Sequence, residues 1–347
     1  MTDLAAFTRG LPKVELHLHI EGTLEPELRF ALAQRNGIQL AYADVAQIRA
    51  SYRFNDLTSF LASYYEGMGV LKTADDFHDL AWAYLRRAHE ENVRYVEMFF
   101  DPQAHTSRGI AFDTVIGGLR QEIVAARRQL GLRAELIMCL LRDYSAEYAM
   151  ATLVQSLPYR ELITGVGLDS DERDNPPSKF AGVFARARSE GFQITMHCDV
   201  DQANTVEHIR QCLEVIGVDR IDHGVNILES EELTDELARR GLGLTVCPIS
   251  NRWVTGDLKA AEIRRLLELG IRVTVNSDDP AYFGGYVTDN LAAVQEAAGL
   301  GPVELVQLQR NAIEISWLPS GAKDRLLADL ERYAELAASP AATSLHG

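Results

Sequence analysis

The chain has 347 residues, 47% of them hydrophobic, and a formal net charge of -16 at pH 7. That length supports one large core or two ordinary domains, and an acidic surface repels phosphate backbones, so we expect no nucleic-acid partner. No apolar run approaches the roughly 20 residues that span a bilayer, and the N-terminus lacks a signal-peptide pattern, so we expect a soluble cytoplasmic protein with no membrane association.

Eight short apolar or alternating runs predict β-strands along the chain. They occupy residues 14–20, 93–100, 134–141, 163–169, 194–199, 220–224, 242–250 and 272–279. Helical patterns separate them, with apolar residues three and four apart, in residues 112–131, 178–191, 205–217 and 259–270. The alternation predicts an α/β fold, a single (β/α)8 TIM barrel over residues 1–338. A doubly wound sheet is the rival fold, but its usual Gly-rich phosphate turn does not follow residue 20.

Two segments depart from the regular alternation. Residues 24–90 contain three or four helical patterns between the first two strands. One of these helices belongs to the barrel, and the others predict an insertion over its mouth, either as simple packing or as a lid that excludes water. Residues 339–347 are expected to form a disordered tail.

Polar residues stand at the ends of four predicted strands. The first strand ends in two histidines two positions apart, whose side chains therefore share one face. These strand-end residues are His17, His19, His197, His223, Asp278 and Asp279. Catalytic groups of such barrels gather at the C-terminal strand ends, and three histidines with a carboxylate suit Zn²⁺. The remaining histidines are expected on the surface: His78, His89, His105, His208 and His346.

Four stretches of the chain resemble one known family. They are LPKVELHLHIEGTLEPEL, RIDHGVNIL, LTVCPISN and VTVNSDDPAYFGGY, and they are similar to the adenosine/adenine deaminases of the amidohydrolase superfamily. FFDPQAHTSRGI and DDPAYFGGY point to the adenine deaminase branch. The nucleoside-acting branch usually carries Asp where this chain has Glu21, so the resemblance favours a free base over a nucleoside.

The resemblance implies a role for each site residue. One zinc ion per chain would be bound by His17, His19, His197 and Asp278. His223 would activate the zinc-bound water, and Asp279 would hydrogen-bond the purine near N7. Substrate-side positions would be taken by Asp169, Ser170 and Glu21. The insertion would add apolar cover from Phe54, Phe60, Tyr64 or Tyr65.

The implied reaction is hydrolytic deamination of a small purine-like base, adenine to hypoxanthine plus ammonia. Zinc lowers the pKa of its bound water toward 7, and the resulting hydroxide attacks the ring carbon that bears the amine. A proton donor at the adjacent ring nitrogen would add about 10² to 10⁴ in rate. Iron or manganese could occupy the same ligands, and a homo-oligomer stays open.

One motif departs from the family pattern. The family's H-A-G-E, whose glutamate is the proton donor, reads His197-Cys198-Asp199-Val200 in this chain. One interpretation is that Asp199 or Asp201 replaces the acid, although aspartate is one methylene shorter. A second is that the substrate is an N6-substituted adenine or another aminated heterocycle. A third is a protein that binds zinc and a purine but hardly catalyses.

Overall fold

The computed structural model describes residues 3–198 and 200–338. The predicted tail at 339–347 and the acid candidate Asp199 therefore lie outside the described residues. No helix within the described part of the chain is long and apolar enough to cross a membrane.

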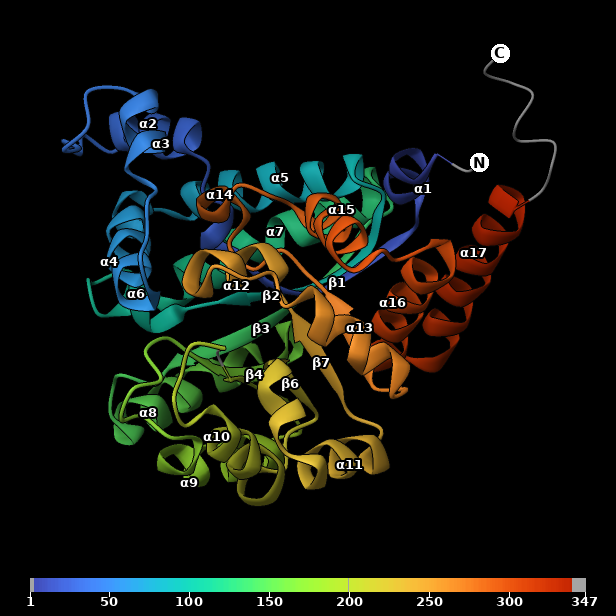
Figure 1. The fold of residues 1–347 in the computed structure, drawn as a ribbon. Coiled ribbons are helices and arrows are strands. Elements are labelled where there is room, and N and C mark those ends of the chain that lie inside the picture. Colours follow the sequence, from blue (N-terminus) through green and yellow to red (C-terminus); the bar gives the residue numbers. More distant parts are fainter. Residues whose placement is uncertain (1–2, 199, 339–347) are drawn as a thin grey trace, which may run out of the picture.

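Eight parallel strands form a barrel in the order of the sequence, and helices surround it (Figure 1). The strands are β1 (Lys13–His19), β2 (Val93–Phe100), β3 (Arg133–Leu141), β4 (Ile163–Asp169), β5 (Gln193–Cys198), β6 (Arg220–His223), β7 (Gly243–Val246) and β8 (Arg272–Val275). The predicted (β/α)8 fold is confirmed. Every described residue of β1 and β6 is buried, as expected for parallel strands covered on both faces.

The sheet closes through the segment that follows β8. Leu18 and Asp278 form a parallel bridge, in which the His19 N–H donates to the Asp278 carbonyl at 3.0 Å and the Asp278 N–H donates to the His17 carbonyl at 3.1 Å. Two residues before Asp278, Asn276 Oδ1 accepts a hydrogen bond from the Leu16 N–H at 2.8 Å. The hydrogen bonds that close the barrel therefore fix His17, His19 and Asp278 beside one another.

Two strands are shorter than predicted. The seventh apolar run continues to residue 250, but β7 ends at Val246 because Pro248, which has no N–H, occupies the first turn of α12 (Pro248–Thr255). The last apolar run reaches residue 279, whereas β8 ends at Val275. Residues 276–279 instead form the segment that closes the barrel and carries its carboxylates.

Helices fill the connections around the barrel. The helices between β2 and β8, besides α12, are α6 (Pro102–Thr106), α7 (Phe112–Gln129), α8 (Ala146–Ser156), α9 (Ala181–Ser189), α10 (Thr205–Gln211), α11 (Glu231–Arg240) and α13 (Ala260–Glu268). Those flanking β8 and the N-terminus are α1 (Leu4–Gly10), α14 (Pro280–Phe283), α15 (Val287–Ala298), α16 (Pro302–Ile315) and α17 (Ser320–Ala338).

Four helices lie between β1 and β2, the region predicted as an insertion. They are α2 (Pro26–Arg35), α3 (Val45–Ser51), α4 (Leu57–Gly67) and α5 (Ala74–Glu90). Helix α5 packs against α7 as an ordinary barrel helix. Helix α4 begins at a capping box formed by Asp56 and Ser59, and its buried Phe60 contacts Phe283 of α14 with ring centroids 4.6 Å apart. This contact holds α4 over the C-terminal end of the barrel.

Candidate metal centre and active-site cavity

The polar strand ends surround one small cavity at the barrel mouth, with a volume of about 40 Å³. Its polar wall consists of His19, Asp101, Asp169, Ser170, His197, His223, Ser250, Asp278 and Asp279. Its aromatic and aliphatic wall consists of Leu57, Phe60, Leu61, Tyr64, Tyr65, Val254 and Phe283. Three of the four predicted cover residues line the cavity, while Phe54 packs behind Phe60 with ring centroids 5.4 Å apart.

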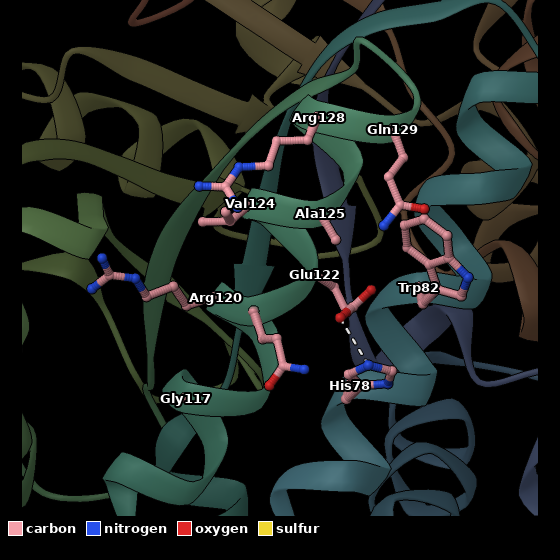
Figure 2. A pocket seen from close by; sticks show the side chains of 10 residues that line it. His78, Trp82, Gly117, Arg120, Glu122, Val124, Ala125, Arg128 and Gln129 are labelled. Atoms are coloured by element: carbon pink, nitrogen blue, oxygen red, sulfur yellow. Dashed lines mark ion pairs between the residues drawn. The ribbon is translucent and has the colours of Figure 1, made fainter.

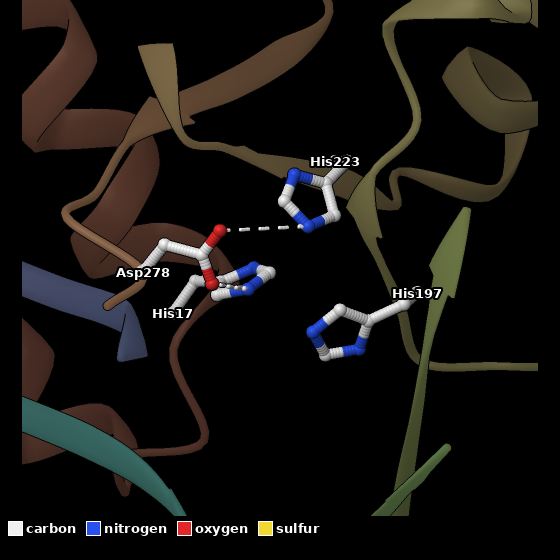
Figure 3. A group of neighbouring side chains, drawn as sticks. All are labelled: His17, His197, His223 and Asp278. Atoms are coloured by element: carbon white, nitrogen blue, oxygen red, sulfur yellow. Dashed lines mark ion pairs between the residues drawn. The ribbon is translucent and has the colours of Figure 1, made fainter. Parts of the chain in front are cut away.

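Four side chains, called the metal group below, converge at the floor of this cavity: His17, His19, His197 and Asp278. His17 Nε2 lies 3.1 Å from Asp278 Oδ1, and His19 Nε2 lies 3.5 Å from the same oxygen and 3.0 Å from His197 Nε2. His223 Nε2 lies 3.9 Å from Asp278 Oδ2. Figure 3 shows the rings of His17, His197 and His223 directed toward Asp278. Ligands about 2.0–2.1 Å from a tetrahedral zinc are separated by about 3.3 Å, so the spacing fits a metal ion.

The opposite nitrogen of each proposed histidine ligand faces an oxygen atom. His17 Nδ1 lies 3.0 Å from Thr245 Oγ1, and His197 Nδ1 lies 3.1 Å from the Leu168 carbonyl oxygen. His19 Nδ1 lies 3.6 Å from Asp169 Oδ2. Such outer contacts fix the ring orientation and leave Nε2 free for the metal. Asp169, predicted at the substrate, faces His19 Nδ1 across a distance slightly longer than a hydrogen bond.

Three cavity residues adopt a left-handed backbone conformation. Ser170, His223 and Asp278 have φ values of 73°, 56° and 64°. Non-glycine residues in this region cost of order 1–3 kcal/mol each, and they concentrate at functional sites. Here they turn the chain at the ends of β4, β6 and the β8 segment, so that each side chain faces the cavity.

Burial sets the charge of the metal group. Burial lowers the pKa of His19 to about 4 and moves the pKa of His197 well below its usual value. Burial alone would raise the pKa of Asp278, but His17, His223 and His19 hold that pKa well below its usual range. Neutral imidazoles and an ionised carboxylate are the forms that bind a divalent cation.

A second group of carboxyls lies beside the metal group. Burial, with the like charges of neighbouring carboxyls, raises the pKa of Asp101 and of Asp279 well above the usual value, and burial raises the pKa of Asp169 to about 7. Gly22 fits against Asp279, because a Cβ there would lie 2.7 Å from the Asp279 Cα. Of the described residues, no lysine or arginine lines the cavity. The cavity therefore holds protonated as well as ionised carboxyl groups and no cationic side chain, so it offers a ligand both hydrogen-bond donors and acceptors.

Glu21 does not line the cavity, although it was expected at the substrate. It is fully buried, and its Oε1 lies 2.8 Å from His105 Nε2 and accepts from the Asp101 N–H at 3.1 Å. The prediction that His105 lies on the surface is wrong, because His105 is needed to pair with this carboxylate. The same holds for His208, which is buried and lies 2.9 Å from Glu172.

Of the two acid candidates, only Asp201 is among the described residues, and it does not line the metal cavity. Asp201 is exposed and lines a separate cavity, which shares only Leu57 with the metal cavity. Asp199 lies outside the described residues. Val200 is buried in the hydrophobic core, and its carbonyl accepts from Asn226 Nδ2 at 3.2 Å.

Three contributors to the site were missed from the sequence. Thr245 sits in the middle of β7 and gives no sequence signal for its contact with His17. Arg142, just after β3, donates to the His197 carbonyl at 3.0 Å from a fully buried position. Asp101, just after β2, could have been found, because it is a polar strand-end residue like those selected.

A larger hollow lies on the outer surface, away from the barrel mouth. This groove of about 880 Å³ runs between α5 and α7, and Figure 2 shows the ion pair within it, His78 Nε2 to Glu122 Oε1 at 2.8 Å. It contains one such pair and none of the strand-end residues, so we assign the chemistry to the smaller cavity.

Comparison with known proteins gives consistent similarities. The model of the family described as adenosine deaminase matches residues 12–333. An adenine deaminase from Rhodospirillum rubrum is 49% identical over 327 residues, 94% of this chain and 97% of that protein. The crystal structure of an adenine deaminase from Arthrobacter aurescens is similar with a TM-score of 0.91 and 41% identity, covering 94% of this chain and 99% of the other. An amidohydrolase from Burkholderia ambifaria, solved with bound zinc, has a TM-score of 0.82 and 27% identity, covering 96% of this chain and 94% of the other.

Proposed function

The chain belongs to the adenosine deaminase family of amidohydrolases, and on this premise we propose that it hydrolyses the exocyclic amine of a free adenine-like base. The products are hypoxanthine and ammonia when the base is adenine. The observation that carries the proposal is the small buried cavity, in which a metal-binding group meets several carboxyls and no cationic side chain. The 49% identity with an adenine deaminase supports the free base as the substrate.

We assign one zinc ion per chain to His17, His19, His197 and Asp278. The donor set fits, because His17 Nε2 is buried and makes no hydrogen bond within the described residues although Asp278 lies close to it. Zinc would supply Lewis acidity that activates a water molecule for attack. Thr245, Asp169 and the Leu168 carbonyl keep the imidazole rings in the orientation this requires.

The protein's own groups orient the substrate and handle protons. His223 faces the metal group and takes the proton of the attacking water. Asp279 binds the imidazole side of the purine, and Ser170, whose Oγ accepts from Tyr65 Oη at 2.9 Å, borders the base. Helix α4 excludes water from above through Phe60, Tyr64 and Tyr65.

The acid that protonates the ring nitrogen is assigned to the 199–201 segment, as Asp199 or Asp201. Val200, at the position of the family glutamate, has no exchangeable proton. The cavity lined by Asp201 adjoins the metal cavity at Leu57, so a small shift of this segment would bring the carboxyl toward the base.

A second candidate is an N6-substituted adenine. Leu57, Leu61 and Val254 form an apolar border at the cavity, which suits an alkyl group on the leaving amine. The same catalytic groups would serve, and an alkylamine would leave in place of ammonia.

The test is product formation by the zinc-loaded protein from adenine, adenosine and a series of N6-substituted adenines. Hypoxanthine and an equal amount of ammonia from adenine, with adenosine at least a hundredfold poorer in kcat/KM, supports the proposal. Turnover only of N6-substituted adenines supports the second candidate. Binding of bases without any turnover refutes both and leaves a purine-binding protein.

A further inference from the structure

Asp101 lies in the cavity wall, where its carboxyl group meets that of Asp169. It is 1% exposed, and no N–H or hydroxyl group of the described residues donates to either carboxyl oxygen. Its neighbour in the wall is the carboxyl of Asp169, and one proton shared by the two carboxyls still leaves acceptor oxygens for a ligand. A buried acceptor that receives no hydrogen bond destabilises the protein by about 1–3 kcal/mol, so we expect a ligand N–H or O–H to bind at this position.

The main chain holds Asp101 in place independently of its carboxyl. Its N–H donates to Glu21 Oε1, and Glu21 is itself paired with His105, whose Nδ1 lies 2.7 Å from Arg108 Nη2. Pro102 starts α6 directly after it. This buried chain of contacts fixes the direction of Asp101 while leaving both of its carboxyl oxygens for the cavity.

The position of Asp101 relative to the metal group indicates which part of a base it meets. The metal group comes from β1, β5 and the β8 segment, whereas Asp101 follows β2 and Asp169 ends β4. His19 separates the two groups, since its Nε2 faces Asp278 and its Nδ1 faces Asp169. A purine whose amine-bearing carbon lies at the metal group extends its imidazole ring toward the carboxyls one histidine ring away.

We propose that Asp101 accepts a hydrogen bond from the imidazole-ring N–H of the bound base and thereby selects free bases over their N9-substituted forms. The inference rests on the proposed function for the orientation of the base. A free purine carries one N–H on its five-membered ring, and a nucleoside carries none. A site built to hydrogen-bond a substrate N–H rejects the analogue that lacks it, because the buried acceptor is left unpaired.

The test compares adenine with 9-methyladenine, in which the ring N–H is replaced by a methyl group. We expect Asp101→Ala to lower kcat/KM for adenine about 10- to 100-fold, the worth of a hydrogen bond to a charged group. The same variant should leave kcat/KM for 9-methyladenine nearly unchanged or improved, so the preference for adenine over 9-methyladenine should fall at least tenfold. The isosteric Asp101→Asn guards against misfolding; its amide oxygen still accepts a hydrogen bond but carries no charge, so the preference should fall in the same direction and by less. Asp143→Asn removes an exposed carboxylate just after β3 and should leave the preference unchanged.

Binding of hypoxanthine and 9-methylhypoxanthine by calorimetry separates this inference from the proposed function. The inference alone would be overturned if the Asp101 variants lowered kcat/KM equally for adenine and 9-methyladenine, and lowered the affinity equally for hypoxanthine and 9-methylhypoxanthine. Absence of adenine turnover by the unmodified enzyme, with preferential binding of hypoxanthine that disappears in Asp101→Ala, would overturn the proposed function and support the inference. Absence of both turnover and base binding would overturn both.

Discussion

At the scale of single residues, the metal group depends on side chains that bind neither the metal nor the base themselves. Thr245 Oγ1 bridges His17 Nδ1 at 3.0 Å and Asp222 Oδ1 at 2.7 Å, with all three residues fully buried. Asp222 in turn accepts from Thr195 Oγ1 at 2.6 Å. This network keeps the His17 ring in one orientation, so its effect should appear in metal affinity before it appears in the fold.

We therefore expect Thr245→Val to weaken zinc binding about 10- to 100-fold, the usual cost of removing an outer contact. Valine keeps the shape of threonine but removes the hydroxyl that His17 and Asp222 share. Competition with a chromophoric chelator measures the affinity, and Thr234→Val, at a threonine of α11 bonded to the Ile227 carbonyl, is the matched control. Equal zinc affinity in Thr245→Val and the unmodified chain would refute the role of this contact.

Val200 is a second residue whose surroundings decide its role. Since its side chain packs in the core and not in the cavity wall, Val200→Glu should not increase adenine turnover. Burying the carboxyl should lower the free energy of unfolding by about 1–3 kcal/mol, which urea denaturation measures. Val200→Gln, of the same size but without an acid, should behave alike. A tenfold or greater gain in turnover specific to the glutamate variant would show that position 200 is the true acid position.

At the scale of elements, α4 supplies much of the cavity wall, and we predict that it controls access to the site. A cavity of about 40 Å³ is smaller than a purine base, so we expect α4 to move when the substrate enters. Thr58 at the start of α4 contacts Arg173 in the loop after β4 through their side chains, and both residues are exposed. This contact links α4 to the loop after β4, so a tether there should hold the helix in the position that the structure shows.

Tying these two positions together should stop turnover. With Thr58→Cys and Arg173→Cys joined by a cleavable thiol-reactive cross-linker, we expect the initial rate of deamination to fall at least tenfold and to recover when the linker is cut. The four native cysteines are buried and should not react. Each single-cysteine variant treated with the same reagent is the control. Full activity of the cross-linked protein would mean that the substrate enters by another route.

The elements themselves were largely predictable from the sequence, because parallel strands are short apolar runs and amphipathic helices separate them. The strands at 93–100 and 163–169 have the predicted bounds. The seventh run was predicted too long because periodicity does not register the Pro248 helix start. The strand-end rule found His17, His19, His197, His223, Asp278 and Asp279 but was not applied to Asp101. It could not find Thr245 or Arg142, whose roles depend on contacts between distant segments.

At the scale of the whole molecule, the contacts that close the barrel also position the residues of the site. The bridge between Leu18 and Asp278 joins the first and last parts of the barrel, and it also sets Asp278 against His17 and His19. A metal ion bound there would link the ends of β1 and β5 to the segment after β8. The account therefore depends on one claim, that this barrel end uses water to replace the amine of a free purine base.

The most direct measurement is the mass of the product formed from adenine by the zinc-loaded protein in oxygen-18 water. The account predicts hypoxanthine with one oxygen-18 atom and one ammonia per hypoxanthine, and no product from Asp278→Asn, which loses a proposed metal ligand. No hypoxanthine from the zinc-loaded protein, or hypoxanthine without the label, would contradict hydrolytic deamination of adenine at this site.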